Sequence, residues 1–197
     1  MRICSENTAI NSGIAKSVKE FINADFIKKD GEVLDYGAGK LRNAKYLVEN
    51  GFSVSILETE EQLRRLKEKY GEEIFKPYKG VFTPQCLPNS KFSLIICSFV
   101  LCVLQNDIDR FNVVQNIYNL LEEDGVVIIE ARTEKCILNA KYIEPYLDGY
   151  LIGKNEIKTF QKPYTEEELR DMFVRRGFEV IQSKTYRGSV IVVARKG

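Results

Sequence analysis

Short hydrophobic runs alternate along the chain with stretches whose spacing is typical of amphipathic helices. A run of four to eight apolar residues between turn signals predicts a strand that is covered on both faces. The buried strands that this pattern predicts lie at 32–36, 53–57, 92–98 and 126–129. Apolar residues three and four positions apart predict the intervening helices. These helices are expected at 42–49, from Glu60 onward and at 109–121, with Gly125 as the stop signal of the third.

The last third of the chain changes this alternation. Thr165 followed by three glutamates is a capping-box arrangement, which predicts the start of a helix that ends at Gly177. Two strands, at 178–183 and 189–194, then follow with only a short turn between them, so we expect them to pair antiparallel. The whole pattern predicts an α/β fold. We expect a Rossmann-like, seven-stranded, mostly parallel sheet with helices on both faces and a C-terminal antiparallel hairpin.

Composition narrows the class of protein further. The chain has 197 residues with 29 basic and 28 acidic side chains, a net charge of +1 that disfavours a protein holding long nucleic acid by phosphate neutralisation. Its length fits a single domain over 1–197. It has no run of about 18 uncharged apolar residues, and its polar opening is unlike a signal peptide, so we expect a cytoplasmic protein without a membrane span.

Two residue types constrain the chemistry. The chain contains no histidine, which excludes Ser-His-Asp and Cys-His nucleophilic catalysis. Its five cysteines form no CxxC pair, so we expect reduced thiols and no metal site. Cys97 and Cys102 are close in sequence and would suit metalloid methylation, but small buried thiols are far commoner.

A glycine-rich turn joins the first predicted strand to the first predicted helix. Gly37 and Gly39 lie at this junction, where the absence of Cβ allows a ligand to approach the backbone and the helix start presents N–H groups to an anion. Glu58 ends the next strand about 20 residues later, where a carboxylate can accept hydrogen bonds from ribose hydroxyls. A bare turn and a solvated charge are the structural alternatives. The combination favours a nucleoside cofactor.

The turn distinguishes between two kinds of cofactor. A dinucleotide fingerprint requires a third glycine, and Arg42 stands there instead, which disfavours NAD and FAD. S-adenosylmethionine has no phosphate, and its zwitterionic end suits Asp35, the amides of the turn and Arg42.

Four longer segments carry a resemblance to a known family. VLDYGAGKLRNAKYLVENGFSV resembles the first motif of class I S-adenosylmethionine-dependent methyltransferases, FSLIICSFVL resembles a later strand, LLEEDGVVII the next one, and Tyr164 to Phe178 a closing helix. The similarity covers about 30–197. Within the class, the chain is similar to tellurite-resistance methyltransferases and to methyltransferases encoded beside DNA-modification systems. The DPPY-type tetrad of amino-methylating DNA enzymes is absent.

The resemblance implies S-adenosylmethionine as cofactor, S-adenosylhomocysteine as product, and a set of binding residues. These residues are Asp35, Gly37, Ala38, Gly39, Arg42, Asn43, Glu58, Thr59, Cys86, Leu87, Ser98 and Phe99. The backbone N–H near Cys86 would read the adenine edge. Leu41 departs from the family, which has a small residue there, and we expect it to narrow the methionine pocket.

The resemblance also suggests a division of the single domain. It consists of an N-terminal helical cover (1–29), a cofactor-binding half (30–135), a substrate lid (136–164) and a closing helix with hairpin (165–197). The lid segment shows no strand or helix pattern but is rich in tyrosine. Tyr142 and Tyr146, together with Arg132 just before it, are the candidates for contact with the acceptor, and packing or a surface ion pair is the alternative for each.

The expected function is therefore methyl transfer from S-adenosylmethionine to a small molecule. Transfer from a sulfonium neutralises charge, so positioning supplies most of the acceleration and a site without histidine suffices. Two alternatives stay open: a macromolecular acceptor, nucleic acid or protein, in a modification or defence setting, with nucleic acid disfavoured; and a cofactor-binding module without catalysis.

Overall fold

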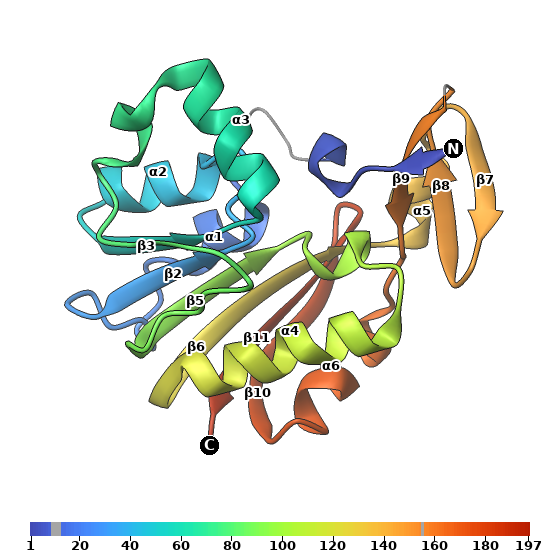
Figure 1. The fold of residues 1–197 in the computed structure, drawn as a ribbon. Helices are drawn as coiled ribbons and strands as arrows, with labels where there is room; N and C mark the ends of the chain where they lie inside the picture. The colour runs from blue at the N-terminus through green and yellow to red at the C-terminus, as the bar shows by residue number, and fades with distance from the viewer. Residues whose placement is uncertain (9–12, 155) are drawn as a thin grey trace.

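The computed structural model describes residues 1–8, 13–154 and 156–197, and its centre is a seven-stranded sheet (Figure 1). Its strands are β2 (Glu32–Tyr36), β3 (Ser53–Leu57), β4 (Val81–Phe82), β5 (Phe92–Ser98), β6 (Leu121–Arg132), β10 (Phe178–Tyr186) and β11 (Ser189–Lys196). They are ordered β10-β11-β6-β5-β2-β3-β4. Strands β2 to β6 are parallel, and β11 is antiparallel to both β6 and β10. The predicted fold is confirmed.

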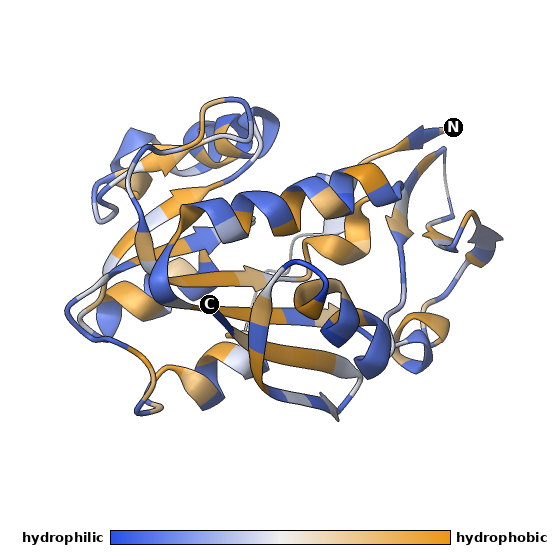
Figure 2. Cartoon of the chain, turned by 90° about the horizontal axis from the view of Figure 1, so that it is seen from below, coloured by the Kyte–Doolittle hydropathy of each residue, from blue (hydrophilic) through white to orange (hydrophobic). Residues whose placement is uncertain are grey.

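Helices cover both faces of this sheet (Figure 1). On one face lie α1 (Lys16–Phe21), α2 (Arg42–Glu49) and α3 (Glu60–Tyr70); on the other lie α4 (Asp107–Leu120) and α6 (Glu166–Val174). Figure 2 shows the strands of the sheet largely hydrophobic and the helices mixed, as the burial of one helix face requires. Short 3₁₀ helices occur at Ser5–Thr8, Glu72–Phe75 and Leu101–Val103.

A second, four-stranded sheet lies beyond the carboxyl end of β6. It contains β1 (Arg2–Ile3), β7 (Ile143–Tyr146), β8 (Gly149–Ile152) and β9 (Ile157–Gln161) in the order β1-β9-β8-β7, with α5 (Glu134–Leu138) beside it (Figure 1). The sequence pattern gave no sign of these strands. Pro145 in β7 is unusual except at a sheet edge, and the β7–β8 turn has Leu147 at φ 49° instead of a glycine.

Two helix ends differ from the expected positions. Helix α4 ends at Leu120, and Leu121 is already extended and paired with Phe92, so Gly125 lies inside β6 and does not stop the helix. The backbone turns instead at Asp124, with φ 61°, and a Cβ at Gly125 would lie 2.8 Å from the Glu122 carbonyl oxygen. Helix α6 likewise ends at Val174, before the expected Gly177.

The N-terminal region is only partly helical. It begins with β1 and a 3₁₀ turn, and α1 then packs on the sheet, where the Ser17 backbone N–H and hydroxyl both donate to Glu130 Oε2. Within the expected helical cover (1–29), residues 9–12 lie outside the described residues. Among those that are described, no helix has the length and apolar character needed to cross a membrane.

Candidate active site

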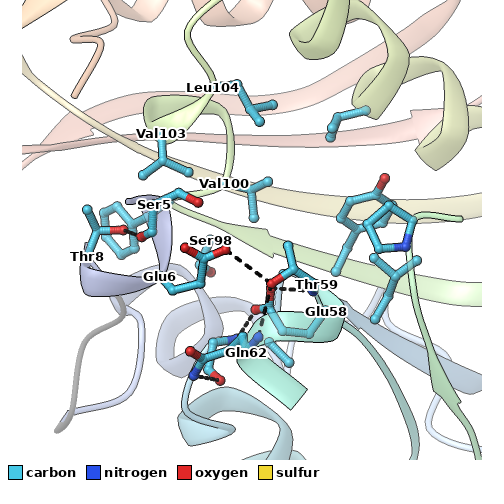
Figure 3. A pocket seen from close by; sticks show the side chains of 18 of the residues that line it. Ser5, Glu6, Thr8, Glu58, Thr59, Gln62, Ser98, Val100, Val103 and Leu104 are labelled. Carbon is cyan, nitrogen blue, oxygen red and sulfur yellow. Dashed lines mark hydrogen bonds between the residues drawn. The ribbon is translucent and has the colours of Figure 1, made fainter. Parts of the chain in front are cut away.

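A cavity of about 420 Å³ opens at the carboxyl ends of β2, β3 and β5 (Figure 3). This is where parallel α/β sheets bind ligands. Nine of the twelve expected binding residues line it. They are Gly37, Ala38, Gly39, Arg42, Asn43, Glu58, Thr59, Ser98 and Phe99.

The glycine turn forms the floor of the cavity, but its N–H groups are already paired. Gly37 N and Ala38 N donate to the Leu57 carbonyl oxygen, at 2.8 and 3.2 Å, and Gly39 N donates to Glu58 Oε2 at 2.6 Å. Both glycines have positive φ, 76° and 56°, which favours glycine. The turn therefore offers a ligand a close backbone surface and not the free N–H groups that the sequence suggested.

Glu58 links the turn to the start of α3. Its Oε2 accepts from Gly39 N, and its Oε1 accepts from Thr59 N at 2.7 Å. Burial of the side chain raises its pKa, and these two bonds oppose that effect. A carboxylate has about four acceptor positions, so Glu58 retains capacity for ligand hydroxyls while its orientation is fixed by backbone.

Asp35 does not line the cavity, contrary to the expected cofactor contact. Its side chain is 1% exposed, and Oδ2 accepts from Ala44 N at 3.0 Å. Leu41, the N-cap residue of α2, has an apolar side chain that cannot accept a hydrogen bond from the first backbone N–H groups of the helix. The Asp35 carboxyl accepts one of these bonds instead. Burial raises the pKa of Asp35 to about 7.

Leu41 leaves the cavity open. Its backbone is left-handed, with φ 64°, and its side chain is 3% exposed within the apolar cluster between α2 and the sheet. It is absent from the cavity wall. The expected narrowing of the pocket by this residue is not found.

Polar contacts join the other expected residues into one wall. Asn43 Oδ1 accepts from Ala15 N at 3.0 Å, and its Nδ2 donates to Ser98 Oγ at 3.3 Å. The Arg42 guanidinium lies 5.6 Å from the Phe99 ring centre and donates to the Gly13 carbonyl oxygen. The N-terminal segment, α2 and β5 are thus held together around the cavity.

Cys86 and Leu87 are not part of the cavity wall, and Pro84 lines it in their place. Cys86 N donates to the Thr83 carbonyl oxygen at 3.0 Å and to its hydroxyl at 3.2 Å, which closes a tight turn. The N–H expected to read an adenine edge is therefore already paired.

The sequence of this chain is similar to those of known proteins. The model of the methyltransferase domain family matches residues 9–183. The chain belongs to this family. The uncharacterized protein YmfD of Escherichia coli (strain K12) is 26% identical over 207 residues, covering 98% of this methyltransferase and 91% of YmfD.

Two solved structures share the fold of this methyltransferase. PH0226 protein from Pyrococcus horikoshii OT3 has a TM-score of 0.73 at 14% identity, covering 91% of this chain and 88% of that one. The glycopeptide N-methyltransferase MtfA, solved with S-adenosyl-L-methionine, has a TM-score of 0.69 at 16% identity, covering 91% and 92%.

Sequence reasoning missed two groups of residues that line the cavity. The first is Ser5, Glu6 and Thr8 in the N-terminal 3₁₀ turn, brought there because β1 pairs with β9. Partial burial raises the pKa of Glu6. Hydrogen bonds from its own backbone N–H and the Cys4 thiol, together with the charge of Arg65, outweigh this effect, so the net shift of the pKa is downward. Figure 3 shows Glu6 facing Thr59, whose hydroxyl donates to it at 3.4 Å.

The second group is a polar stripe on α4 of this methyltransferase. Asp109, Asn112 and Asn116 line the cavity, and Asn116 Nδ2 donates to the Tyr36 hydroxyl at 3.5 Å. Their spacing of three and four residues places them on one side of the helix and is readable in the sequence, whereas the apolar positions predict only the buried face.

The three residues predicted to contact the methyl acceptor do not lie together at one site. Arg132 lines a second cavity beside α5. Tyr142 is 59% exposed and Tyr146 packs edge-on against Phe160, and neither lines the described cavities. Burial raises the pKa of Cys97 and of Cys102, the latter to about 11, so both thiols stay neutral at pH 7.

Proposed function

We propose that this chain transfers a methyl group from S-adenosylmethionine to a small molecule, with the cofactor bound in the 420 Å³ cavity. The observation that carries the proposal is the placement of Glu58 and the glycine turn on one wall of that cavity. Family membership supports the reaction class, and the shared fold with MtfA, which was solved with S-adenosyl-L-methionine, supports the cofactor.

The lining of the cavity fits this cofactor. Its volume is within the range of about 300–1,000 Å³ typical of small-molecule sites. The positive-φ turn at Gly37 gives a wall without Cβ atoms, and Leu41 is turned away. Glu58 has unused acceptor positions for two ribose hydroxyls. The acidic lining residues Glu6, Glu58 and Asp109 outnumber the basic ones, Lys40 and Arg42, which favours a cationic ligand.

When bound, S-adenosylmethionine supplies a methyl group on a positively charged sulfur, and its transfer leaves S-adenosylhomocysteine. The chain's own residues position the partners and exclude water. Val100, Val103 and Leu104 form the apolar part of the cavity wall (Figure 3). Because the transfer removes the positive charge of the sulfonium, this apolar lining favours it, and an N–H or O–H acceptor releases its proton to water.

The test is Glu58→Ala, measured by calorimetric titration with S-adenosylmethionine. Loss of hydrogen bonds to a carboxylate costs about 1.5–3 kcal/mol, so we expect the Kd to rise roughly tenfold to a hundredfold. Glu68→Ala is the matched control, because Glu68 is an exposed glutamate on α3, the helix that follows Glu58, and among the described residues its ion-pair partner is Arg64. Equal affinity for both variants, with thermal unfolding unchanged, would falsify the assignment of Glu58.

A further inference from the structure

A second cavity, of about 180 Å³, lies between α5 and the small sheet. Its polar lining includes Arg132, Thr159 and Gln161, and Ile137 and Ile152 supply apolar surface. Thr8 lines both this cavity and the larger one. Phe99 lines the larger cavity, and the guanidinium of Arg132, which lines the smaller one, lies 5.2 Å from its ring centre.

Arg132 brings a positive charge to this cavity, and its guanidinium forms no ion pair with the described residues. Its Nη1 donates to Cys136 Sγ at 3.6 Å, a weak acceptor. In the described ranges no acidic side chain forms an ion pair with it, and residues 9–12 and 155 are Ala, Ile, Asn, Ser and Asn. The Arg42 guanidinium lies near the same Phe99 ring and adds like charge, which the carboxyl groups of Glu130 and Asp35 oppose. A planar guanidinium in this position matches a carboxylate, which it can bind through two parallel hydrogen bonds.

Gln161 supplies the second observation. Its side chain is 4% exposed, yet its Oε1 is buried with no hydrogen-bond partner among the described residues. A buried acceptor left unpaired costs about 1–3 kcal/mol, so such groups in native proteins usually have a partner. Gln161 lines the smaller cavity, and a rotation of its amide would turn Oε1 toward a ligand N–H or O–H bound there.

We propose that this smaller cavity binds the methyl acceptor, and that the acceptor is a small organic acid. Its carboxylate pairs with Arg132, its N–H or O–H group donates to Gln161, and its apolar part contacts Ile137 and Ile152. The inference rests on the proposed methyltransferase function. A volume of 180 Å³ is below the range of drug-sized sites, which favours a single small molecule over a polymer segment.

The probes are 4-aminobenzoate and anthranilate, with aniline as the analogue without a carboxylate. Binding to the full chain is measured by calorimetry with saturating S-adenosylhomocysteine present. We expect at least one of the acids to bind and aniline to bind at least tenfold more weakly. Arg132→Met should weaken acid binding at least tenfold, and Arg132→Lys, which keeps the charge, should weaken it less.

Gln161 is tested with benzoate as the matched probe, since benzoate has the carboxylate but no N–H donor. Gln161→Leu should weaken aminobenzoate binding severalfold and leave benzoate binding unchanged. Thermal unfolding checks that each variant is folded, and Lys135→Met, an exposed cation on α5, is the control for net charge.

Three results overturn the inference: neither acid binds the wild-type chain, aniline binds as tightly as the acids, or Arg132→Met and Lys135→Met weaken the acids equally. A loss of S-adenosylmethionine affinity in Arg132→Met as large as that in Glu58→Ala would place Arg132 in the cofactor site and also overturn it. If the wild-type chain fails to bind S-adenosylmethionine, the proposed function itself fails, which the first titration reveals separately.

Discussion

At the scale of single residues, Asp35 shows how one carboxyl can resemble a ligand group and serve the fold. The sequence places it beside the glycine turn, where a cofactor contact is a reasonable expectation. The side chain is instead enclosed by the sheet and α2 and accepts from the helix start. Nothing in the local sequence distinguishes these roles, because the decision depends on Leu41 adopting a left-handed backbone and leaving α2 without a side-chain cap.

Asp35 predicts a specific dependence of stability on pH. Its pKa rises from 3.8 to about 7 on folding, so between these values the folded state binds a proton that the unfolded state has released. The free energy of unfolding therefore falls as pH rises from about 4 to about 7 and then levels off. Urea unfolding of wild type and Asp35→Asn over pH 4–8 measures this.

The asparagine retains an oxygen acceptor for Ala44 N but cannot ionise. We expect the difference in unfolding free energy between Asp35→Asn and wild type to grow by a few kcal/mol in favour of the variant across that range. A difference that stays constant with pH would show that the Asp35 carboxyl titrates normally.

Gly37 is constrained by its neighbour as well as by its backbone. A Cβ there would lie 2.2 Å from Val100 Cγ2, at a φ of 76°. We expect Gly37→Ala to destabilise the fold by about 2–4 kcal/mol, from the left-handed backbone and the overlap together. In a Val100→Ala background the same change should cost only about 1 kcal/mol, measured by urea unfolding. Equal costs in both backgrounds would mean that the two side chains do not meet.

At the scale of elements, the small sheet is attached to the large one through a buried arginine. Arg110 of α4 is 1% exposed; it donates through Nε and Nη2 to the Leu104 carbonyl oxygen and through Nη2 to Asp148 Oδ1 at 2.9 Å. Asp148 follows Leu147 in the β7–β8 turn. Lys162 pairs with the same carboxylate and with Glu168, so the attachment continues to α6.

Asp148→Ala should therefore destabilise the fold by about 2–3 kcal/mol, since it removes the partner of a buried charge. Asp107→Ala is the matched control. Asp107 also pairs with Arg110, at 2.7 Å from its Nη1, but the Asp107 side chain is 91% exposed. We expect it to cost less than about 1 kcal/mol. Urea unfolding compares the two, and hydrogen exchange locates the loosened region. Equal costs, or unchanged exchange in β7 and β8, would contradict this attachment.

The elements that were predicted correctly share one property: the residues within each element determine its type and its bounds. Strands 32–36, 53–57 and 92–98 and helix 42–49 have the predicted bounds, because uninterrupted apolar runs and clear helix starts leave little choice. The small sheet has no such signal. Strand β1 is two residues long and is stabilised only by pairing with β9, which lies more than 150 residues away in sequence.

At the scale of the whole molecule, the same contrast explains which part of the candidate site could be predicted. Most of the predicted cofactor residues that line the larger cavity lie at the ends of β2, β3 and β5 and in the turns that follow them, and motif spacing found them. The remaining residues come from the N-terminal turn, α4 and the small sheet, and they reach the cavities only through tertiary pairing. Glu6 and Gln161 could not be recognised as lining residues before the topology was known, whereas the spacing of the polar residues around Asn112 on α4 was readable in the sequence.

The parallel pairing of β1 with β9 also has a practical consequence for protein engineering. Met1 precedes a strand at the edge of the small sheet, only a few residues before the turn that borders the larger cavity, whereas Gly197 lies on the far side of the molecule (Figure 1). An affinity tag or fluorescent fusion joined ahead of Met1 would therefore lie on the small-sheet side of the molecule, nearer to the cavities. The same fusion placed after Gly197 would leave them accessible.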